Sequence, residues 1–282
     1  MKNFSRSYRL VAGPAGQTGF QIGEAAGASG MPLHISFAIE KSDVDSDNTG
    51  RCTIWNLNAE HIDMLNRPDC IVSLRAGYGD VMPLIFSGVV TYVATAADGA
   101  DRATEVELTD SRIEVRDAVI SVSFAGKVNS KKILQYIADA MGVTLSLGWD
   151  TTFRDVSNFA FVGSGKKAVS KICELNGLVF SIQNGILQVK TPGSTMSREV
   201  FLLSPETGLI GTPKRITIAA TDSTPAQHGW EVEYLMNAAI SIDDYVRLES
   251  KSVQGYFRAS KIAIEGDSHS GVWQCTGTFL EV

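Results

Sequence analysis

The sequence predicts a mainly β protein with an α+β insertion. Two stretches, residues 71–110 and 243–282, have the pattern of three short strands separated by turns rich in Gly, Asp and Ser. Apolar and polar residues alternate along the first strand of each stretch, at Val72–Arg75 and at Val246–Glu249, which is typical of a strand with one buried face. Two amphipathic helical patterns lie between these stretches and indicate the insertion.

The two β stretches have the same order of strands and turns, so we predict that the chain contains two copies of one β unit. The alternative is that any two antiparallel meanders look alike at this level of detail. In the second copy, a change in the parity of the apolar residues predicts a bulge near Ser260, and the sequence from Gly266 to Gly271 predicts a turn. The closing strand places Trp273, Cys275 and Phe279 on one side. In the first copy we expect a loop over Ala96–Arg102, before a closing strand.

Short strands and one helix are predicted ahead of the first copy. His34 lies on the less apolar face of its strand, where we expect it to be exposed to solvent. Asn58 is a suitable cap for the helix. The glycine-rich stretch 13–30 lacks the spacing of a phosphate-binding loop, and the acidic stretch 42–50 lacks the spacing of a calcium loop. The expected elements are strands at Tyr8–Ala12, Phe20–Ile22, Leu33–Glu40 and Cys52–Leu57, and a helix at Ala59–Leu65.

The insertion, Val119 to Lys190, combines helices and strands. We expect Ser130 to cap one helix, which ends at Gly142, and a second helix to begin at Ser164 or Gly165 and to end at Gly177. Asn184-Gly185 is the strongest hairpin signal in the chain. The expected strands are Val119–Phe124, Val143–Leu147, Leu178–Ile182 and Ile186–Val189.

A linker and three further strands are predicted between the insertion and the second copy. Residues 191–197 have the composition of a linker. We expect a long loop over Pro205–Pro213. The strands are expected at Val200–Ser204, Ile216–Ala220 and Trp230–Tyr234.

The composition is that of a globular protein with a large core. The chain has 282 residues, of which 44% are hydrophobic and 20% charged. A net charge of −6 argues against nucleic-acid binding, which needs a basic surface. No run approaches the ~18 apolar residues of a membrane helix, and the N-terminus lacks the apolar core of a signal peptide. The four cysteines lack metal-binding spacing, so we expect buried, reduced thiols rather than metal ligands or disulfides.

No group of residues predicts a catalytic, cofactor-binding or metal site. Neighbouring carboxylates on strands and turns point in different directions, which does not suit the paired carboxylates of a glycosidase. Ser268-His269-Ser270 is contiguous, whereas catalytic triads assemble from distant segments. The histidines lack metal-ligand spacing. The candidates considered are Asp43 with Asp45, Asp243 with Asp244, Glu265 with Asp267, and the histidines His61, His228 and His269. We therefore expect a component of an assembly and not an enzyme.

The most specific of several characteristic segments is the Gly-Asp-x-His-Ser-Gly-x-Trp turn at Gly266–Trp273. The other segments are TIWNLN from Thr53, VSLRAGY and LIFSGVV in the first copy, LLSPETGLIGTPKR from Leu202, WEVEYLMNAAISIDDYVRLES from Trp230, and YFRASKIAIEGDSHSGVWQC from Tyr256. These segments, in the same order along nearly the whole chain, resemble phage tail baseplate hub proteins of the contractile-tail group that includes the Mu hub and the late control protein type.

The resemblance implies two similar tube-like β-barrel domains per chain and a homotrimer that forms a pseudo-six-fold ring. It divides the chain into a first barrel at residues 1–115, an α+β inserted module at 116–198 and a second barrel at 199–282. The implied partners are the tail tube or tube-initiator protein, the central spike protein and other baseplate proteins, in a virion assembled in the bacterial cytoplasm. The unpaired edges of each unit would form the joints, with Val72–Arg75 and Val246–Glu249 as candidate ring-lining strands. A tail protein that binds or degrades the cell wall through the middle module is the alternative.

Overall fold

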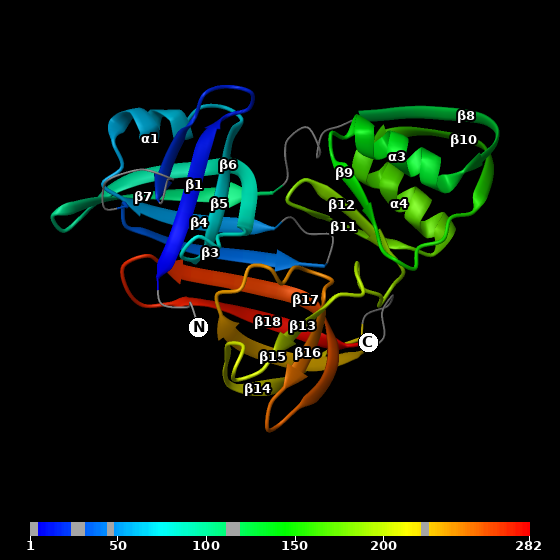
Figure 1. Ribbon diagram of the computed structural model, residues 1–282. Helices are drawn as coiled ribbons and strands as arrows, with labels where there is room; N and C mark the ends of the chain where they lie inside the picture. The colour runs from blue at the N-terminus through cyan, green and yellow to red at the C-terminus, as the bar shows by residue number, and fades with distance from the viewer. Residues whose placement is uncertain (1–4, 24–31, 44–47, 111–118, 221–225) are drawn as a thin grey trace.

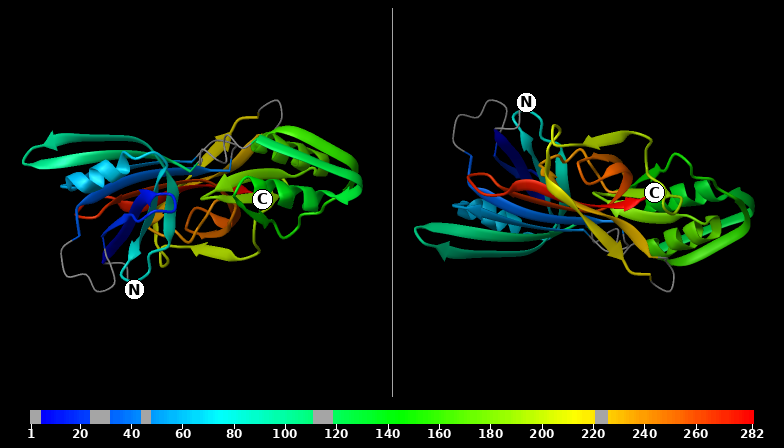
Figure 2. Two further views of the ribbon diagram at one scale, coloured as in Figure 1. Left: turned by 90° about the horizontal axis from the view of Figure 1, so that it is seen from above. Right: turned by 90° about the horizontal axis from the view of Figure 1, so that it is seen from below.

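A large β body and a smaller α+β module make up the chain (Figure 1). The computed structural model describes residues 5–23, 32–43, 48–110, 119–220 and 226–282. Each part has its own cluster of buried apolar side chains. The two views of Figure 2 place the hairpin of β6 and β7 at one end of an elongated molecule and the module at the other. Within the described ranges, no helix is both long and apolar enough to cross a membrane.

The first half of the β body precedes the module in the sequence. Asn58 caps the short helix as predicted, because its side chain accepts a hydrogen bond from the backbone N–H of His61. The elements are β1 (Arg6–Pro14), β2 (Phe20–Gly23), β3 (Ile35–Ser42), β4 (Thr49–Trp55), α1 (Ala59–Leu65), β5 (Cys70–Tyr78), β6 (Leu84–Asp98) and β7 (Asp101–Thr109).

The second half follows the module. Its elements are β13 (Val200–Leu203), β14 (Leu209–Ile218), β15 (Gln227–Leu235), β16 (Tyr245–Glu249), β17 (Gln254–Asp267) and β18 (Trp273–Glu281). On β18, Trp273, Cys275 and Phe279 are buried, as their alternation with polar residues predicts.

All strands of the β body belong to one sheet, in which β3 of the first half pairs with β17 of the second. This pairing is antiparallel, and Ile39 lies opposite Ile264. One cluster of buried side chains extends through both halves and includes Phe86 and Phe279. The halves therefore share a sheet and a core, although they are separated by the module in the sequence.

The order of strand pairing repeats between the halves. In the first half neighbouring strands run β1-β5-β6-β7-β4-β3, and in the second they run β13-β16-β17-β18-β15-β14. Each long strand also has a bulge at the matching place: Thr91 is the extra residue of β6 opposite β7, and Ser260 is the extra residue of β17 opposite β18. The bulge near Ser260 was predicted and is confirmed. The halves differ in that β1 is antiparallel to β5, whereas β13 is parallel to β16.

The α+β module consists of two helices that pack against each other and against two small sheets. The Asn184-Gly185 turn has positive φ at both residues and joins β11 to β12, as predicted. Gly177 ends the second helix in the left-handed conformation. The elements are β8 (Val119–Asn129), α3 (Ser130–Ala140), β9 (Thr144–Leu147), β10 (Asp155–Ser164), α4 (Gly165–Asn176), β11 (Val179–Gln183) and β12 (Ile186–Lys190).

Two local expectations in the module were wrong. The cap of α3 is Asn129, whose side chain accepts from Lys131 N–H, while Ser130 is buried and donates to the carbonyl of Arg154. The strand β10 was missed, because it pairs with the distant β8 and is interrupted near Asn158, where φ is positive and the register shifts. The missed strand completes the two-stranded sheet that covers the helices.

Two predicted loops of the β body are largely strand. The loop expected over Ala96–Arg102 is a tight turn, because β6 and β7 stay paired as far as Asp98 and Asp101. The loop expected over Pro205–Pro213 ends early, since β14 already begins at Leu209 and pairs with β15 around a register shift. In both places distant pairing overrides the local turn residues.

The four cysteines are free and buried. Burial raises the pKa of the Cys52 and Cys173 thiols to about 12 and that of Cys275 to about 11. Such thiols stay protonated and unreactive at neutral pH.

Candidate assembly surfaces

The turn that follows β17 fastens the joint between the two halves. Asp267 accepts hydrogen bonds from the backbone N–H groups of His269 and Ser270, at 2.9 Å each, which closes the turn. Ser268 exchanges two bonds with Ile35 at the start of β3: its N–H donates to the carbonyl of Ile35, and its hydroxyl accepts from Ile35 N–H. The serine is thus occupied in holding strands together.

Side chains on both sides of this turn extend the joint to other strands. Arg6 of β1 donates to the carbonyl oxygens of Asp267 and Gly271, at 2.8 Å each. Trp273 donates from its indole nitrogen to the carbonyl of Gly77, at 3.3 Å. The Gly266–Trp273 sequence therefore binds the second half to β1, β3 and β5 of the first.

A stack of rings covers one side of the turn. His34 stacks on Trp55 with ring centroids 3.9 Å apart and on His269 at 4.3 Å. Its Nε2 lies 3.1 Å from both carboxylate oxygens of Asp267. Partial burial works against ionisation of Asp267, but hydrogen bonds from Ser270, His34 and His269 outweigh it and lower its pKa. The expectation that His34 is exposed to solvent was wrong, because the turn and Trp55 cover its ring.

A buried ionic cluster joins the module to both halves. Arg258 donates to Asp43 and, at 2.6 Å, to Asp243. Lys190, the last residue of β12, lies 2.7 Å from the same oxygen of Asp243, and Ser260 donates to Asp43 at 2.9 Å. The four charged residues come from the first half, the module and the second half, so the cluster is the point at which all three parts meet.

The charges of this cluster depend on one another. Burial raises the pKa of Asp243, against the opposing effect of Lys190 and Arg258. Burial likewise lowers the pKa of Lys190, against the attraction of Asp243. For Arg258, burial is outweighed by Asp43 and Asp243, which raise its pKa. Removal of one partner would leave the remaining buried charges with less compensation.

The hairpin of β11 and β12 provides a second contact between the module and the first half. Gln183 donates to the carbonyl of Ser42 at 2.8 Å and accepts from Asn48 at 2.8 Å. The side chain of Asn184 accepts from Ser87 N–H at 3.1 Å. Asn184 therefore both forms the hairpin turn and attaches this turn to the first half.

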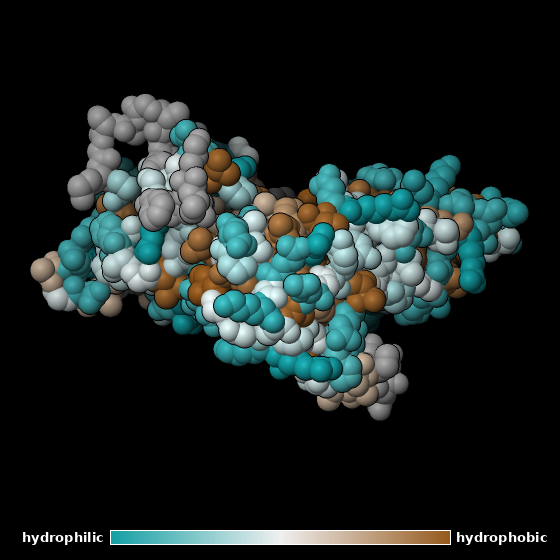
Figure 3. All heavy atoms as spheres, turned by 60° about the horizontal axis from the view of Figure 1, so that its bottom comes forward, coloured by the Kyte–Doolittle hydropathy of each residue, from teal (hydrophilic) through white to brown (hydrophobic). Residues whose placement is uncertain are grey.

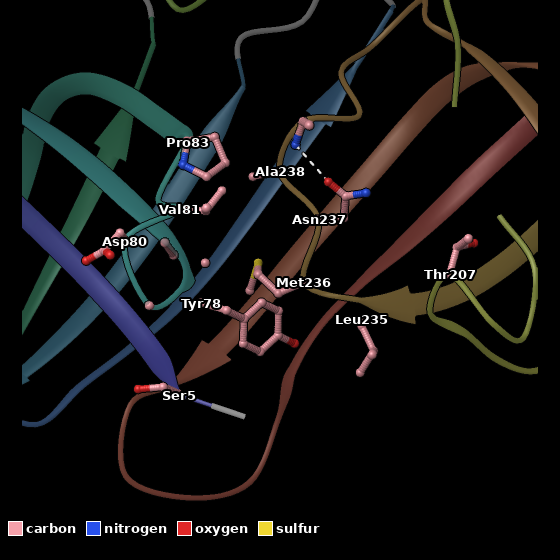
Figure 4. Close-up of a pocket in the computed structure, with 14 residues that line it drawn as sticks. Ser5, Tyr78, Asp80, Val81, Pro83, Thr207, Leu235, Met236, Asn237 and Ala238 are labelled. Atoms are coloured by element: carbon pink, nitrogen blue, oxygen red, sulfur yellow. Dashed lines mark hydrogen bonds between the residues drawn. The ribbon is translucent and has the colours of Figure 1, made fainter. Parts of the chain in front are cut away.

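A pocket of about 640 Å³ lies where the two halves meet away from the module (Figure 4). Its walls are the turn from Tyr78 to Pro83 and the segment Leu235–Ala239. Val81 is 71% exposed at its rim, and Asn237 directs its side-chain oxygen to Ala239 N–H. The lining is mainly apolar and has one carboxylate, Asp80. It suits contact with another apolar surface better than acid–base chemistry.

The face drawn in Figure 3 carries apolar residues in patches over the middle of the β body, whereas the module is mostly polar. Exposed apolar patches commonly mark interaction surfaces. On this face the β body therefore suits assembly contacts better than the module does.

The structure brings together two groups of the residues considered for chemistry: those around Asp267, and Asp43 with Asp243, which Arg258 joins in the ionic cluster. The others are scattered over the fold. His61 stacks on Phe20 with ring centroids 4.0 Å apart, and His228 contacts the hydroxyl of Thr217. Asp243 belongs to the ionic cluster, and Asp45 lies outside the described residues. Nowhere in the described part of the chain do three or more His, Cys, Asp or Glu side chains form a group that could hold a metal ion.

Sequence reasoning missed the residues that hold the parts together, namely Arg6, Gln183, Lys190 and Arg258. Their partners are remote in the chain: Arg258 and Asp43 are 215 residues apart, and Arg6 and Asp267 are 261 apart. The one local signal was that a long basic side chain occupies an otherwise apolar stretch of β17 at Arg258.

Comparison with known proteins identifies the family. Residues 47–269 match the family model described as baseplate hub gp41. No curated protein sequence matches the chain. Three similar solved structures share the fold at low sequence identity. They are the tail protein from Neisseria meningitidis MC58 (10% identity, TM-score 0.62, 97% of this chain and 96% of that one), the 43 kDa tail protein of prophage MuSo2 from Shewanella oneidensis (9%, 0.61, 98% and 97%), and the E. coli c3393 protein of the type VI secretion system (10%, 0.58, 89% and 74%).

The family match covers well over half of the chain, and the mainly β fold agrees with that of these tail proteins. The expected resemblance to baseplate hub proteins is confirmed. The chain belongs to the baseplate hub gp41 family and is a structural hub of a phage tail baseplate.

Proposed function

We propose that the chain adapts a six-fold tail tube to a three-fold central spike by forming a homotrimer. A ring of six-fold symmetry and a spike of lower symmetry can meet through a closed cyclic assembly whose subunit contains two equivalent units. Three such chains present six units. Each unit would then face one subunit of the tube.

The observation that carries this proposal is the repeated order of strand pairing in the two halves, with a matching bulge in β6 and β17. Two unrelated β units would not be expected to have a bulge at the same place in the same strand of the pairing order. The shared core and the joint between β3 and β17 would hold the two units at a fixed angle.

We further propose that the chain is organised as a first tube-like domain at 1–115, an inserted module at 116–198 and a second tube-like domain at 199–282. The separate cluster of buried residues in the module supports these limits. The ionic cluster and the Gln183 contacts would hold the module in place on the outside of the ring.

The partners that follow are the tail tube or tube-initiator protein on one side of the ring and the central spike on the other, with further baseplate proteins around it. A contractile tail and assembly in the host cytoplasm belong to the same proposal. One similar structure is that of the PdpA–VgrG complex from Francisella (8% identity, TM-score 0.55, 53% of that chain covered). It supports the fold without identifying a partner of this chain.

Native mass spectrometry of the hub released from tail particles tests the proposal. We expect a species of three times the 30.3 kDa chain, alone or with spike attached. A stable hexamer would contradict the adaptor function. Binding of the purified chain to peptidoglycan, or loss of turbidity of a cell-wall suspension, would instead favour the cell-wall alternative.

A further inference from the structure

One stretch of β6 has a free edge where the equivalent stretch of β17 is occupied. Beyond its bulge, β17 pairs with β18 on one side and with β3 on the other, over Lys261–Asp267. Beyond its own bulge, β6 pairs with β7 over Tyr92–Asp98, and within the described ranges no strand covers its second side. The first half therefore has the same binding edge as the second half, but it is open.

A strand of the kind that fills this edge lies free at the other end of the sheet. Within the chain, the edge of β17 is filled by β3, which pairs with β4 on one side and with β17 on the other. The equivalent strand in the second half is β14, which pairs with β15 on one side and, among the described strands, has no neighbour on its second side. Figure 1 shows β14 at the lower border of the sheet, remote from the hairpin of β6 and β7. One chain therefore cannot join its own two free edges.

The candidate ring-lining strands Val72–Arg75 and Val246–Glu249 do not form these edges. The first segment lies in β5, between β1 and β6. The second lies in β16, between β13 and β17. Each is already paired on both sides.

We propose that β14 of one copy of the chain pairs in antiparallel fashion with Tyr92–Asp98 of β6 in the next copy, in the register by which β3 pairs with β17. This inference rests on the proposed trimeric ring and names the contact that closes it. Because the two edges differ, the contact is heterologous, and repetition around an axis closes a ring in which all six joints are alike.

The register follows from the two bulges. Lys261 comes directly after the bulge of β17 and lies opposite Ser42; Tyr92 has the same position in β6. The strands β4 and β15 are equivalent because they pair with β7 and β18, which lie opposite the two bulges. Their own partners, β3 and β14, can therefore be aligned. In this alignment Glu40 is equivalent to Ile216, and Ser42 is equivalent to Ile218.

The proposed joint thus places Tyr92 opposite Ile218 and Ala94 opposite Ile216. Tyr92 is 52% exposed and Ile218 is 41% exposed in the single chain, so the register brings two uncovered apolar side chains together. Aromatic and β-branched residues are favourable cross-strand pairs. At the joint within the chain, Lys261 has the place of Tyr92 and Glu40 has the place of Ile216, and the two form a diagonal ion pair at 2.9 Å.

Charge is also complementary at the proposed joint. Lys214 of β14 comes opposite Ala96, one place along the same face from Asp98. In the single chain Lys214 is exposed and lies 3.5 Å from Glu231, on its own side of the joint. The short side chains of Ala94, Ala96 and Ala97 leave room for an approaching strand.

Engineered disulfides test the register. The variant Ala94→Cys with Ile216→Cys should cross-link neighbouring chains in isolated tail particles under mild oxidation. Non-reducing denaturing electrophoresis should then give bands at two and three times the 30.3 kDa chain. The matched control, Ala263→Cys with Glu40→Cys, occupies the equivalent places of the internal joint and should form a disulfide within one chain. The native cysteines are buried and should not contribute.

The outcomes separate the joint from the proposed function. A trimer in native mass spectrometry, with the control disulfide formed but no cross-link between chains, would overturn the joint and leave the adaptor function in place. Absence of a trimer would overturn both. As a second readout, Ile218→Asp should abolish trimer formation while the purified chain keeps its unfolding midpoint, since Ile218 is exposed in the single chain. A trimer that tolerates Ile218→Asp would contradict the joint.

Discussion

The long strands β6 and β17 have equivalent neighbours up to the bulge and the same bulge, yet they carry different side chains beyond it. In β17 the residues that face the core, Ile262 and Ile264, are buried against β3. In β6 the last three residues, including Ala97, are exposed. The difference teaches that the strand framework is common to both units, whereas the side chains differ according to whether another strand of the same chain covers the edge.

The largest expected effect concerns the position two residues before the bulge, which is Arg258 in β17 and Val89 in β6. Arg258→Ala should lower the free energy of unfolding by about 3–5 kcal/mol, because it removes the cation that Asp43 and Asp243 share and leaves Lys190 as the one cation of the cluster. Chemical denaturation of the purified variant measures the loss.

A matched control for this prediction is Arg247→Ala. Arg247 pairs with Glu249 at the surface of the adjacent strand β16, so its loss should be below about 1 kcal/mol. Equal losses for the two variants would mean that the buried cluster does not stabilise the contact among the three parts of the chain.

A smaller effect is expected at Gly266 of β17, which is equivalent to Ala97 of β6. A Cβ at Gly266 would lie 2.3 Å from Cζ of Phe37, so Gly266→Ala should cost about 1–3 kcal/mol through overpacking. The reciprocal change Ala97→Gly should cost about 0.5–1 kcal/mol, because Ala97 is exposed. Thermal unfolding of both variants, and of Gly266→Ala combined with Phe37→Leu, provides the test. If the double variant is no more stable than Gly266→Ala, the ring of Phe37 is not the obstacle.

The last effect is a pH dependence that arises from Asp244 in the second half. Burial raises the pKa of Asp244 from 3.8 to about 6, and the neighbouring charges of Asp243 and Glu199 act in the same direction. Since the folded state binds this proton more tightly than the unfolded state, the stabilisation is complete below pH 3.8 and is lost as the pH rises through about 6. The difference in stability between the wild type and Asp244→Asn should therefore become less favourable to the wild type over that window. Unfolding midpoints that run parallel from pH 4 to pH 7 would contradict the assignment.

Features that depend on neighbouring residues were predictable from the sequence. The Asn184-Gly185 hairpin, the cap at Asn58 and the bulge at Ser260 each follow from a few adjacent residues, and all three are present. The mainly β fold with helices in the middle follows from the same periodicities.

Features that depend on the pairing of distant segments were not predictable from the sequence. The extension of β6 to Asp98 is determined by β7 and overrides a sequence rich in turn formers. The position of β5 and β16 inside the sheet results from β1 and β13, which no local pattern connects to them. The ionic cluster around Arg258 requires the positions of three separate parts of the chain, so its residues could be noticed but not assembled.

The joint between β3 and β17 has a consequence for synthesis of the chain. His34 and Asp267 are 233 residues apart, which a ribosome takes roughly 10 to 50 s to translate at ordinary rates. Throughout that interval β3 has an uncovered edge, which is a site for aggregation. The intervening module has a core of its own and can fold during the wait, which shortens the flexible loop that β17 must close when it emerges. Slower translation after residue 190 would thus expose β3 for longer, and the yield of soluble hub should decrease with the length of that pause.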